Sequence, residues 1–212
     1  MTGAIFDMDG LLFDTERIFQ ETWGELAIEN GHPLDEFFAG KICGASQEIS
    51  LQTLREYYPG KDPQDVSKEC WRRMRLKLET FVPVKKGAEE ILRSFRENGY
   101  KLAVASSTDA KQIEHNLVLT GLRSYFDEII SGQEVKNGKP HPDIFLLAAK
   151  RIDCRPEDCY VFEDSLNGVR AGYAAGCKTI MIPDLIAPTG DVRQAAFGIY
   201  ESLAEARKNL LP

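Results

Sequence analysis

Short apolar runs alternate with amphipathic stretches over most of this sequence. Runs typical of buried strands lie at Gly3–Phe6, Leu102–Ala105, Ile129–Ile130, Cys159–Phe162 and Thr179–Ile182. Helical patterns follow Gly87 and Asp109, and two more lie at Pro142–Arg151 and Ser165–Ala175. Because continuous apolar strands separated by helices are typical of βαβ units, the pattern predicts an α/β fold: a Rossmann-like parallel sheet with helices on both faces.

A long stretch after the first strand has a different character. Between Glu16 and Asn30, Ile18, Trp23 and Leu26 recur at helical spacing among charged residues. Residues 34–80 continue in this helical style, with Pro63 near a helix start. We therefore expect two domains, a core formed by residues 1–14 and 81–212 and a helical insertion formed by residues 15–80.

Composition and charge narrow the class of protein. The 212 residues include 33 Asp and Glu against 26 Lys and Arg, so the net charge of −7 argues against a nucleic-acid partner. No apolar run approaches the roughly 18–20 residues of a membrane span, and the N-terminus lacks a basic leader region. The five cysteines are scattered without a C-x-x-C motif, which predicts free thiols and no zinc site. We expect a cytoplasmic monomer with no membrane contact.

Acidic side chains follow two of the predicted strands. Asp7 and Asp9 come after the first, and Glu163 and Asp164 come after the strand at Cys159–Phe162. Since ligands of open parallel sheets bind beyond the carboxyl ends of the strands, these carboxylates should share one edge. Four carboxylates repel each other unless a cation lies among them, and oxygen-only ligands favour Mg²⁺.

The same edge should hold groups suited to a phosphoryl group. Asp7 and Asp9 are two residues apart, so in extended chain both project to one side, and Gly10 allows a sharp turn. One carboxylate can attack while the other transfers a proton. Ser106 offers a hydroxyl and Lys139 a positive charge to non-bridging phosphoryl oxygens.

Each feature also has a purely structural interpretation. Asp7 to Gly10 could form a turn or part of a calcium loop, although a third acidic ligand is missing. Ser106 to Asp109 could cap a helix, and Lys139 could be a solvated loop lysine. Glu163 and Asp164 could be favourable charges at a helix N-terminus. The joint order of these residues favours the chemical interpretation.

Four segments resemble the signature motifs of the haloacid dehalogenase-like hydrolase superfamily. They are FDMDGLLFDT at 6–15, AVASST at 103–108, NGKPHPDIF at 137–145 and VFEDSLNGVRAGYAAG at 161–176. The resemblance is strongest to β-phosphoglucomutase-like and pseudouridine 5′-phosphatase-like phosphatases, and it implies that the helical insertion is a cap domain.

The resemblance implies a role for each matching residue. Asp7 would be the nucleophile that forms an aspartyl-phosphate, and Asp9 the general acid and base. Ser106 and Lys139 would bind phosphoryl oxygens. The metal site would consist of Asp7, the backbone carbonyl of Asp9, Asp164 and, as a ligand or supporting carboxylate, Glu163. The candidate substrate-binding residues are Ser107, Thr108, Lys41, Gly44 and Gln47.

Two features bear on the reaction. Asp9 favours phosphoryl transfer over dehalogenation, because release of an alkoxide from a phosphate ester needs a proton donor. True β-phosphoglucomutases carry a histidine at the position of Phe19, and a lysine and an arginine at those of Cys43 and Gln47. The absence of these groups removes contacts to a second phosphate, so it favours water as the acceptor and a phosphatase over a mutase. The expected substrate is a small sugar phosphate or nucleotide-like monophosphate. A phosphosugar mutase, a non-catalytic regulatory protein and, more remotely, a dehalogenase stay open as alternatives.

Overall fold

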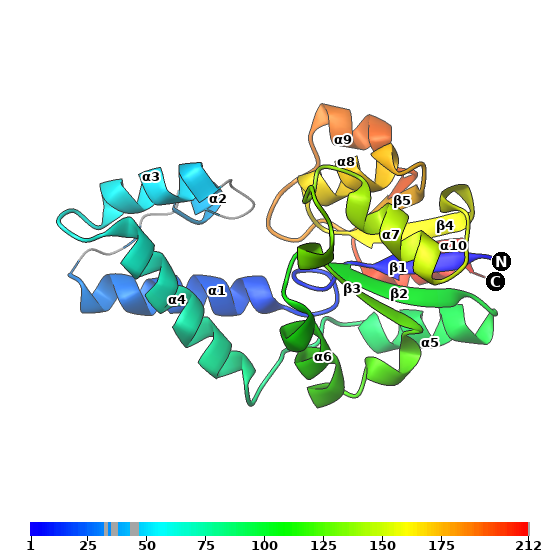
Figure 1. The fold of residues 1–212 in the computed structure, drawn as a ribbon, viewed down its shortest axis with the longest axis horizontal. Helices are drawn as coiled ribbons and strands as arrows, with labels where there is room; N and C mark the ends of the chain where they lie inside the picture. Colours follow the sequence, from blue (N-terminus) through cyan, green and yellow to red (C-terminus); the bar gives the residue numbers. More distant parts are fainter. Residues whose placement is uncertain (32–33, 35–37, 43–46, 212) are drawn as a thin grey trace. The chain divides into compact units, whose positions relative to one another are not determined.

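The computed structural model describes residues 1–31, 34, 38–42 and 47–211. The chain forms two compact units, one made of Met1–Asp14 with Pro83–Pro212 and the other of Thr15–Val82. The first unit is a sheet covered by helices, and the second is helical (Figure 1).

The first unit contains a six-stranded sheet in the order β3-β2-β1-β4-β5-β6. Every neighbouring pair is parallel. The strands are β1 (Gly3–Phe6), β2 (Lys101–Ser106), β3 (Glu128–Ser131), β4 (Cys159–Glu163), β5 (Lys178–Met181) and β6 (Gly198–Ile199). The α/β fold with a parallel sheet, predicted from the alternation of apolar runs and helices, is confirmed.

Both faces of the sheet are covered. On one side Ile5 joins a cluster of buried residues from α7 (Asp143–Arg151) and α8 (Leu166–Ala174). On the other, Phe6 meets Phe95 of α5 (Ala88–Glu97) edge to face, with ring centroids 6.0 Å apart. Adjacent strand residues thus point into opposite cores, which explains why the strands are continuously apolar.

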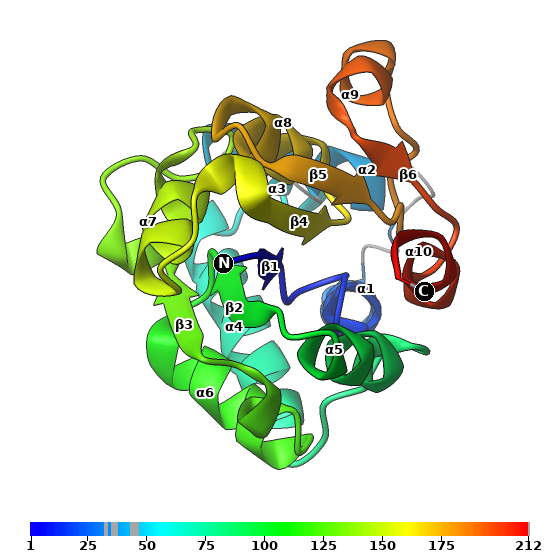
Figure 2. The ribbon, with the colours of Figure 1, turned by 90° about the vertical axis from the view of Figure 1, so that its right-hand side faces the viewer.

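The handedness of the connections between strands determines which face of the sheet each helix covers. Figure 2 shows α5 on one side of the sheet and α7 and α8 on the other. The chain moves from β1 to β3 in one direction and then returns past β1 to β4, so right-handed connections place the later helices on the opposite face. The remaining helices of this unit are α6 (Ala110–Leu119), α9 (Gly190–Ala195), α10 (Leu203–Leu210) and the 3₁₀ turns Arg123–Tyr125, Gly132–Glu134 and Pro156–Asp158.

Strand order reverses at β1, and this reversal positions the site. β1 pairs with β2 on one side and with β4 on the other, so Phe6 lies level with Val104 and Phe162. The residues that follow these three positions therefore meet at one edge. In open parallel sheets such a reversal leaves a crevice beyond the carboxyl ends of the strands.

The second unit comprises α1 (Thr15–Glu29), α2 (Phe38–Ile42), α3 (Gln47–Tyr57) and α4 (Pro63–Leu78). Helix α1 packs on α4, and Trp23 lies in an aromatic cluster with Phe19, Phe38 and Tyr58. Asp62 caps α4, its side chain accepting a hydrogen bond from the Gln64 N–H at 2.7 Å. None of the helices in the described part of the chain has the length and apolar character that a membrane span requires.

Candidate active site

The residues predicted to carry chemistry meet at the edge formed by β1, β2 and β4. Asp7 follows β1, Ser106 ends β2, and Glu163 ends β4. All three are buried, with relative exposures of 6%, 1% and 0%. Buried polar groups require partners. Lys139, on the loop before α7, contacts two of these residues, Asp7 and Glu163.

The Lys139 ammonium joins the two buried carboxylates. It donates to Asp7 Oδ1 and to Glu163 Oε1, each at 2.5 Å, and to the Ala105 carbonyl at 3.3 Å. Three acceptors match the three N–H donors of an ammonium group. The alternative interpretation of Lys139 as a solvated loop lysine is excluded for this structure, because its side chain is only 9% exposed.

Both carboxylate oxygens of Glu163 accept hydrogen bonds. Oε2 accepts the backbone N–H of Ser165 at 3.0 Å and the Ser165 hydroxyl at 2.9 Å. Gly168 provides the space, since a Cβ there would lie 1.8 Å from the Glu163 carboxyl carbon. Helix α8 therefore needs glycine at this position to hold the carboxylate.

Asp164 completes an acidic cluster. Oxygens of Asp7, Glu163 and Asp164 all lie within 4.8 Å of one another, a separation that a single cation could bridge. Gly10 makes room for Asp164: its φ is +82°, and a Cβ there would lie 2.3 Å from Asp164 Oδ2. Glycine therefore suits this position for its conformation and its lack of a side chain.

The charges of this cluster are unbalanced. Burial raises the pKa of Asp7 to about 8, Lys139 opposes the rise, and Glu163 and Asp9 add to it. Burial would lower the pKa of Lys139, but Asp7 and Glu163 outweigh it and raise that pKa. Lys139 thus stays cationic, yet one positive charge does not compensate the surrounding carboxylates.

Asp9 points to a different set of partners. Its Oδ2 accepts hydrogen bonds from the Ser106 hydroxyl at 3.1 Å and from the Thr108 hydroxyl at 2.8 Å. Asp7 and Asp9, two residues apart in sequence, are therefore engaged by different groups. Asp7 faces the ammonium and the acidic cluster, whereas Asp9 faces the loop after β2. Such a division suits two carboxylates with separate tasks.

The loop after β2 also begins α6. Asp109 is the N-cap of this helix and accepts the Gln112 N–H at 3.1 Å. The capping role considered for this segment therefore belongs to Asp109. Ser107 is exposed, and its main chain passes close to Gly132, where a Cβ would lie 3.0 Å from the Ser107 Cα.

The predicted substrate-binding residues of the helical unit are described only in part. Lys41 lies 3.8 Å from Glu56 and 5.2 Å from the centre of the Tyr57 ring. Gly44 lies outside the described residues, and Gln47 is the first residue of α3.

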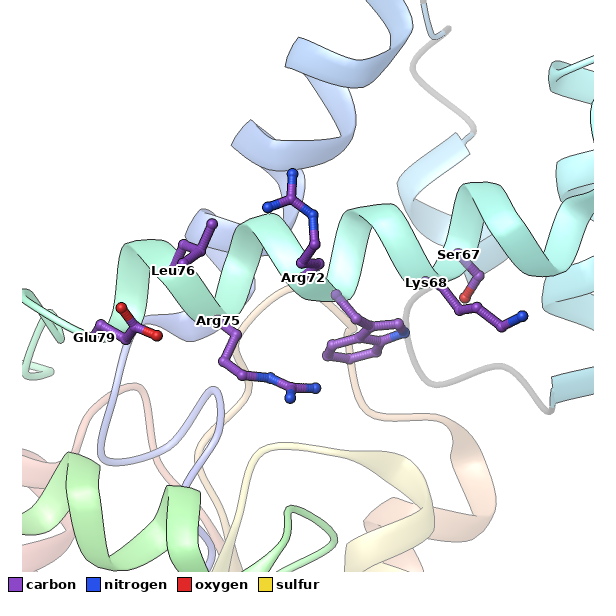
Figure 3. A pocket seen from close by; sticks show the side chains of 7 residues that line it. Ser67, Lys68, Arg72, Arg75, Leu76 and Glu79 are labelled. Atoms are coloured by element: carbon purple, nitrogen blue, oxygen red, sulfur yellow. The ribbon is translucent and has the colours of Figure 1, made fainter.

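Residues of α4 line a pocket that was not predicted from the sequence. Figure 3 shows Arg75 and Lys68 extending from this helix. Arg72 forms two hydrogen bonds with Glu69, whereas Arg75 has no ion pair among the described residues. The residues lining the pocket are Ser67, Lys68, Trp71, Arg72, Arg75, Leu76 and Glu79.

Comparison with known proteins places the chain in a family. The model of the haloacid dehalogenase-like hydrolase family matches residues 4–182, so the chain belongs to that family, as its motifs predicted.

Named relatives and a solved structure resemble it over most of its length. It is 35% identical over 181 residues to a phosphorylated carbohydrates phosphatase of Thermotoga maritima, covering 85% of this chain and 84% of that protein. It is also 35% identical over 193 residues to a Drosophila melanogaster protein named "Probable pseudouridine-5'-phosphatase", covering 87% and 82% of the two chains. A hydrolase of this family from Deinococcus radiodurans R1, solved with phosphate and sodium, aligns with a TM-score of 0.83 at 30% identity, over 99% of this chain and 95% of that one.

Proposed function

We propose that the protein is a Mg²⁺-dependent phosphatase, a phosphoric monoester hydrolase that acts on a small phosphorylated metabolite through an aspartyl-phosphate on Asp7. The observation that carries the proposal is the arrangement of the two aspartates: the Lys139 ammonium lies 2.5 Å from Asp7 and from Glu163, while Asp9 accepts hydrogen bonds from the hydroxyls of Ser106 and Thr108. The names of the relatives support a phosphate ester as the substrate.

The donor set fits a hard divalent cation. Asp7, Glu163 and Asp164 supply oxygens within 4.8 Å of one another, and the backbone carbonyl of Asp9 is the further ligand that the family resemblance implies. A buried nucleophile whose pKa burial raises to about 8 needs additional positive charge to stay ionised at neutral pH. Bound there, Mg²⁺ would supply that charge and help to neutralise the phosphoryl oxygens.

The first half of the reaction transfers the phosphoryl group to the protein. An Asp7 carboxylate oxygen forms a bond to phosphorus while the bond from phosphorus to the ester oxygen breaks. Asp9 gives its proton to that leaving oxygen, so the product departs as an alcohol. Lys139 and Ser106 hold the non-bridging oxygens as charge spreads over them.

The second half regenerates Asp7. Asp9, now a carboxylate, takes a proton from a water molecule whose oxygen bonds to phosphorus. The bond between phosphorus and Asp7 breaks, which releases inorganic phosphate and returns Asp9 to its protonated form. Each turnover therefore consumes one water molecule and leaves both aspartates unchanged.

One unit would carry out catalysis and the other would select the substrate. In this proposal residues 1–14 and 81–212 form the catalytic core and residues 15–80 a cap that selects the substrate. The sequence suggests Ser107, Thr108, Lys41, Gly44 and Gln47 as candidate substrate contacts. We propose a monomeric cytoplasmic enzyme.

A phosphate-release panel tests the proposal. The purified protein is assayed with Mg²⁺ and with excess chelator on hexose 1- and 6-phosphates, pentose phosphates, nucleoside monophosphates and pseudouridine 5′-phosphate. We expect chelator-sensitive release from at least one class, loss of turnover in Asp7→Asn, and a decrease of about 10²–10⁴-fold when Asp9 is replaced. Phosphate release by Asp7→Asn would exclude Asp7 as the nucleophile. Isomerisation without phosphate release, dependent on a bisphosphate primer, would indicate a mutase instead.

A further inference from the structure

Two hydroxyl groups share one oxygen of Asp9. The Thr108 Oγ1 donates to Asp9 Oδ2 at 2.8 Å, and the Ser106 Oγ donates to the same atom at 3.1 Å. The Thr108 backbone N–H in turn donates to Ser106 Oγ at 3.1 Å. Ser106 and Thr108 are thus coupled to each other and to Asp9.

Ser106 can donate only one hydrogen bond at a time. A serine hydroxyl carries one donor hydrogen, and here that hydrogen is directed at Asp9. In the proposed function, on which this inference rests, Ser106 donates to a phosphoryl oxygen. Its hydrogen bond to Asp9 must then break. Of the two hydroxyls that Asp9 Oδ2 accepts in this structure, only Thr108 would continue to hold it.

A hydrogen bond from the end of β3 holds the backbone of Thr108 in place. Its carbonyl accepts the hydroxyl of Ser131 at 2.7 Å, and Ser131, the last residue of β3, is only 1% exposed. Ser131 also accepts the Gln133 N–H at 3.2 Å and donates its own backbone N–H to Glu134 at 2.8 Å. The end of the neighbouring strand therefore fixes the position from which Thr108 reaches Asp9.

We propose that Thr108 is a positioning residue for the acid and base Asp9: it orients the Asp9 carboxylate after Ser106 has turned to the phosphoryl group. This role differs from the direct substrate contact that the sequence suggested for Thr108. A substrate contact would affect binding of every phosphate ester. A positioning role affects the steps in which Asp9 transfers a proton, and it affects them most when the leaving oxygen is strongly basic.

The test compares Thr108→Val, which removes the hydroxyl at nearly constant shape, with Thr108→Ser, which keeps it. The substrates are p-nitrophenyl phosphate, whose phenolate leaves without protonation, and the sugar phosphate that the wild type hydrolyses fastest in the panel. Stopped-flow measurement of the first phenolate release follows phosphorylation of Asp7, and steady-state assays give kcat and KM. Thermal unfolding confirms that both variants are folded.

We expect Thr108→Val to lower kcat on the sugar phosphate by about 10- to 100-fold, the worth of one hydrogen bond to a charged group, with KM changed less than about threefold. The first phenolate release should stay within about twofold of the wild type, and Thr108→Ser should restore most of kcat.

Three results would overturn the proposal. A raised KM on both substrates with slowed phenolate release would assign Thr108 to substrate binding. An unchanged kcat would show that Asp9 does not depend on Thr108, and a higher kcat would show that Thr108 holds Asp9 away from its working position. The wild type separates this inference from the proposed function, because absence of phosphate release by the wild type contradicts the function itself.

Discussion

Replacement of Lys139 by methionine tests the electrostatic design of the site. In the native protein the ammonium pairs with Asp7 and Glu163, whose side chains are 9% and 1% exposed. Methionine fills a similar volume but leaves both carboxylates without their shared cation. Removing one member of a buried ionic cluster costs about 3–5 kcal/mol, because the remaining charges are desolvated and unpaired. For a chain of this size the corresponding decrease in Tm is roughly 6–20 °C.

The assay is thermal unfolding in chelator-containing buffer, so that no divalent cation replaces the missing charge. Lys85→Met is the matched control: Lys85 also pairs with two aspartates, Asp184 at 2.6 Å and Asp14 at 3.4 Å, but its side chain is 23% exposed. Because those partners are better solvated, we expect a smaller loss, about 1–2 kcal/mol.

The pH dependence provides a second criterion. Lys139 opposes the burial that raises the pKa of Asp7 to about 8, so in Lys139→Met the pKa of Asp7 rises further, and the folded variant binds more protons than the folded wild type or the unfolded chain. Stability then falls as pH rises, and the deficit relative to the wild type should be larger at pH 8 than at pH 5. A variant within about 1 kcal/mol of the wild type at pH 8 in chelator would refute the interpretation of Lys139 as the partner of two buried charges.

Three further predictions concern the cation, a glycine and a strand end. Because the pKa of Asp7 is raised from 3.8 to about 8, protons compete with the ion, and the increase in Tm caused by Mg²⁺ should grow from pH 5 to pH 8; a pH-independent increase would contradict Asp7 as a ligand. Gly168→Ala should displace Glu163 and lower the rate of phosphate release at least about tenfold. Gly24→Ala should leave the rate unchanged, because a Cβ at Gly24 has no atom within 4 Å; equal rates for the two variants would contradict the need for glycine at position 168. Partial burial acts to raise the pKa of Asp127, but the Leu102 N–H and Arg96 hold it below its usual range. Asp127→Asn should therefore lower the free energy of unfolding by about 1 kcal/mol at pH 7, and by less as pH falls through the native pKa of Asp127. Urea unfolding at pH 7 and pH 3 measures both losses, and equal losses would contradict this role of the Asp127 carboxylate.

The sheet could be predicted because its strands are buried on both faces. Runs such as Leu102–Ala105 and Cys159–Phe162 are continuously apolar, and the structure places them in β2 and β4. The last elements were not predicted. β6 has only two residues, Gly198–Ile199, which is too short for a period, and α9 has only one buried residue, Val192. Tertiary context, not local pattern, determines these elements.

The site was predictable at the level of strand ends and not at the level of side-chain partners. The parallel topology alone brings Asp7, Ser106 and Glu163 to one edge. That Lys139 lies between two carboxylates follows from the path of a loop more than 130 positions from Asp7 in the sequence, which no local pattern encodes. The orientation of Asp9 toward Thr108 likewise depends on side-chain rotamers. Gly168 lies four residues after Asp164 in the sequence, and its role in making room for Glu163 is visible only in the structure.

The proposed mechanism requires Asp7 to carry the phosphoryl group during turnover. Asp9→Asn should still be phosphorylated by p-nitrophenyl phosphate, because the phenolate needs no proton, but it should hydrolyse the aspartyl-phosphate slowly. Mass spectrometry of the acid-quenched, digested variant should then find one added phosphoryl group on the peptide that contains Asp7, and none when Asp7 is also replaced by asparagine. Continued release of phenolate and phosphate with Asp7 unmodified, or with the phosphoryl group on another residue, would contradict Asp7 as the nucleophile.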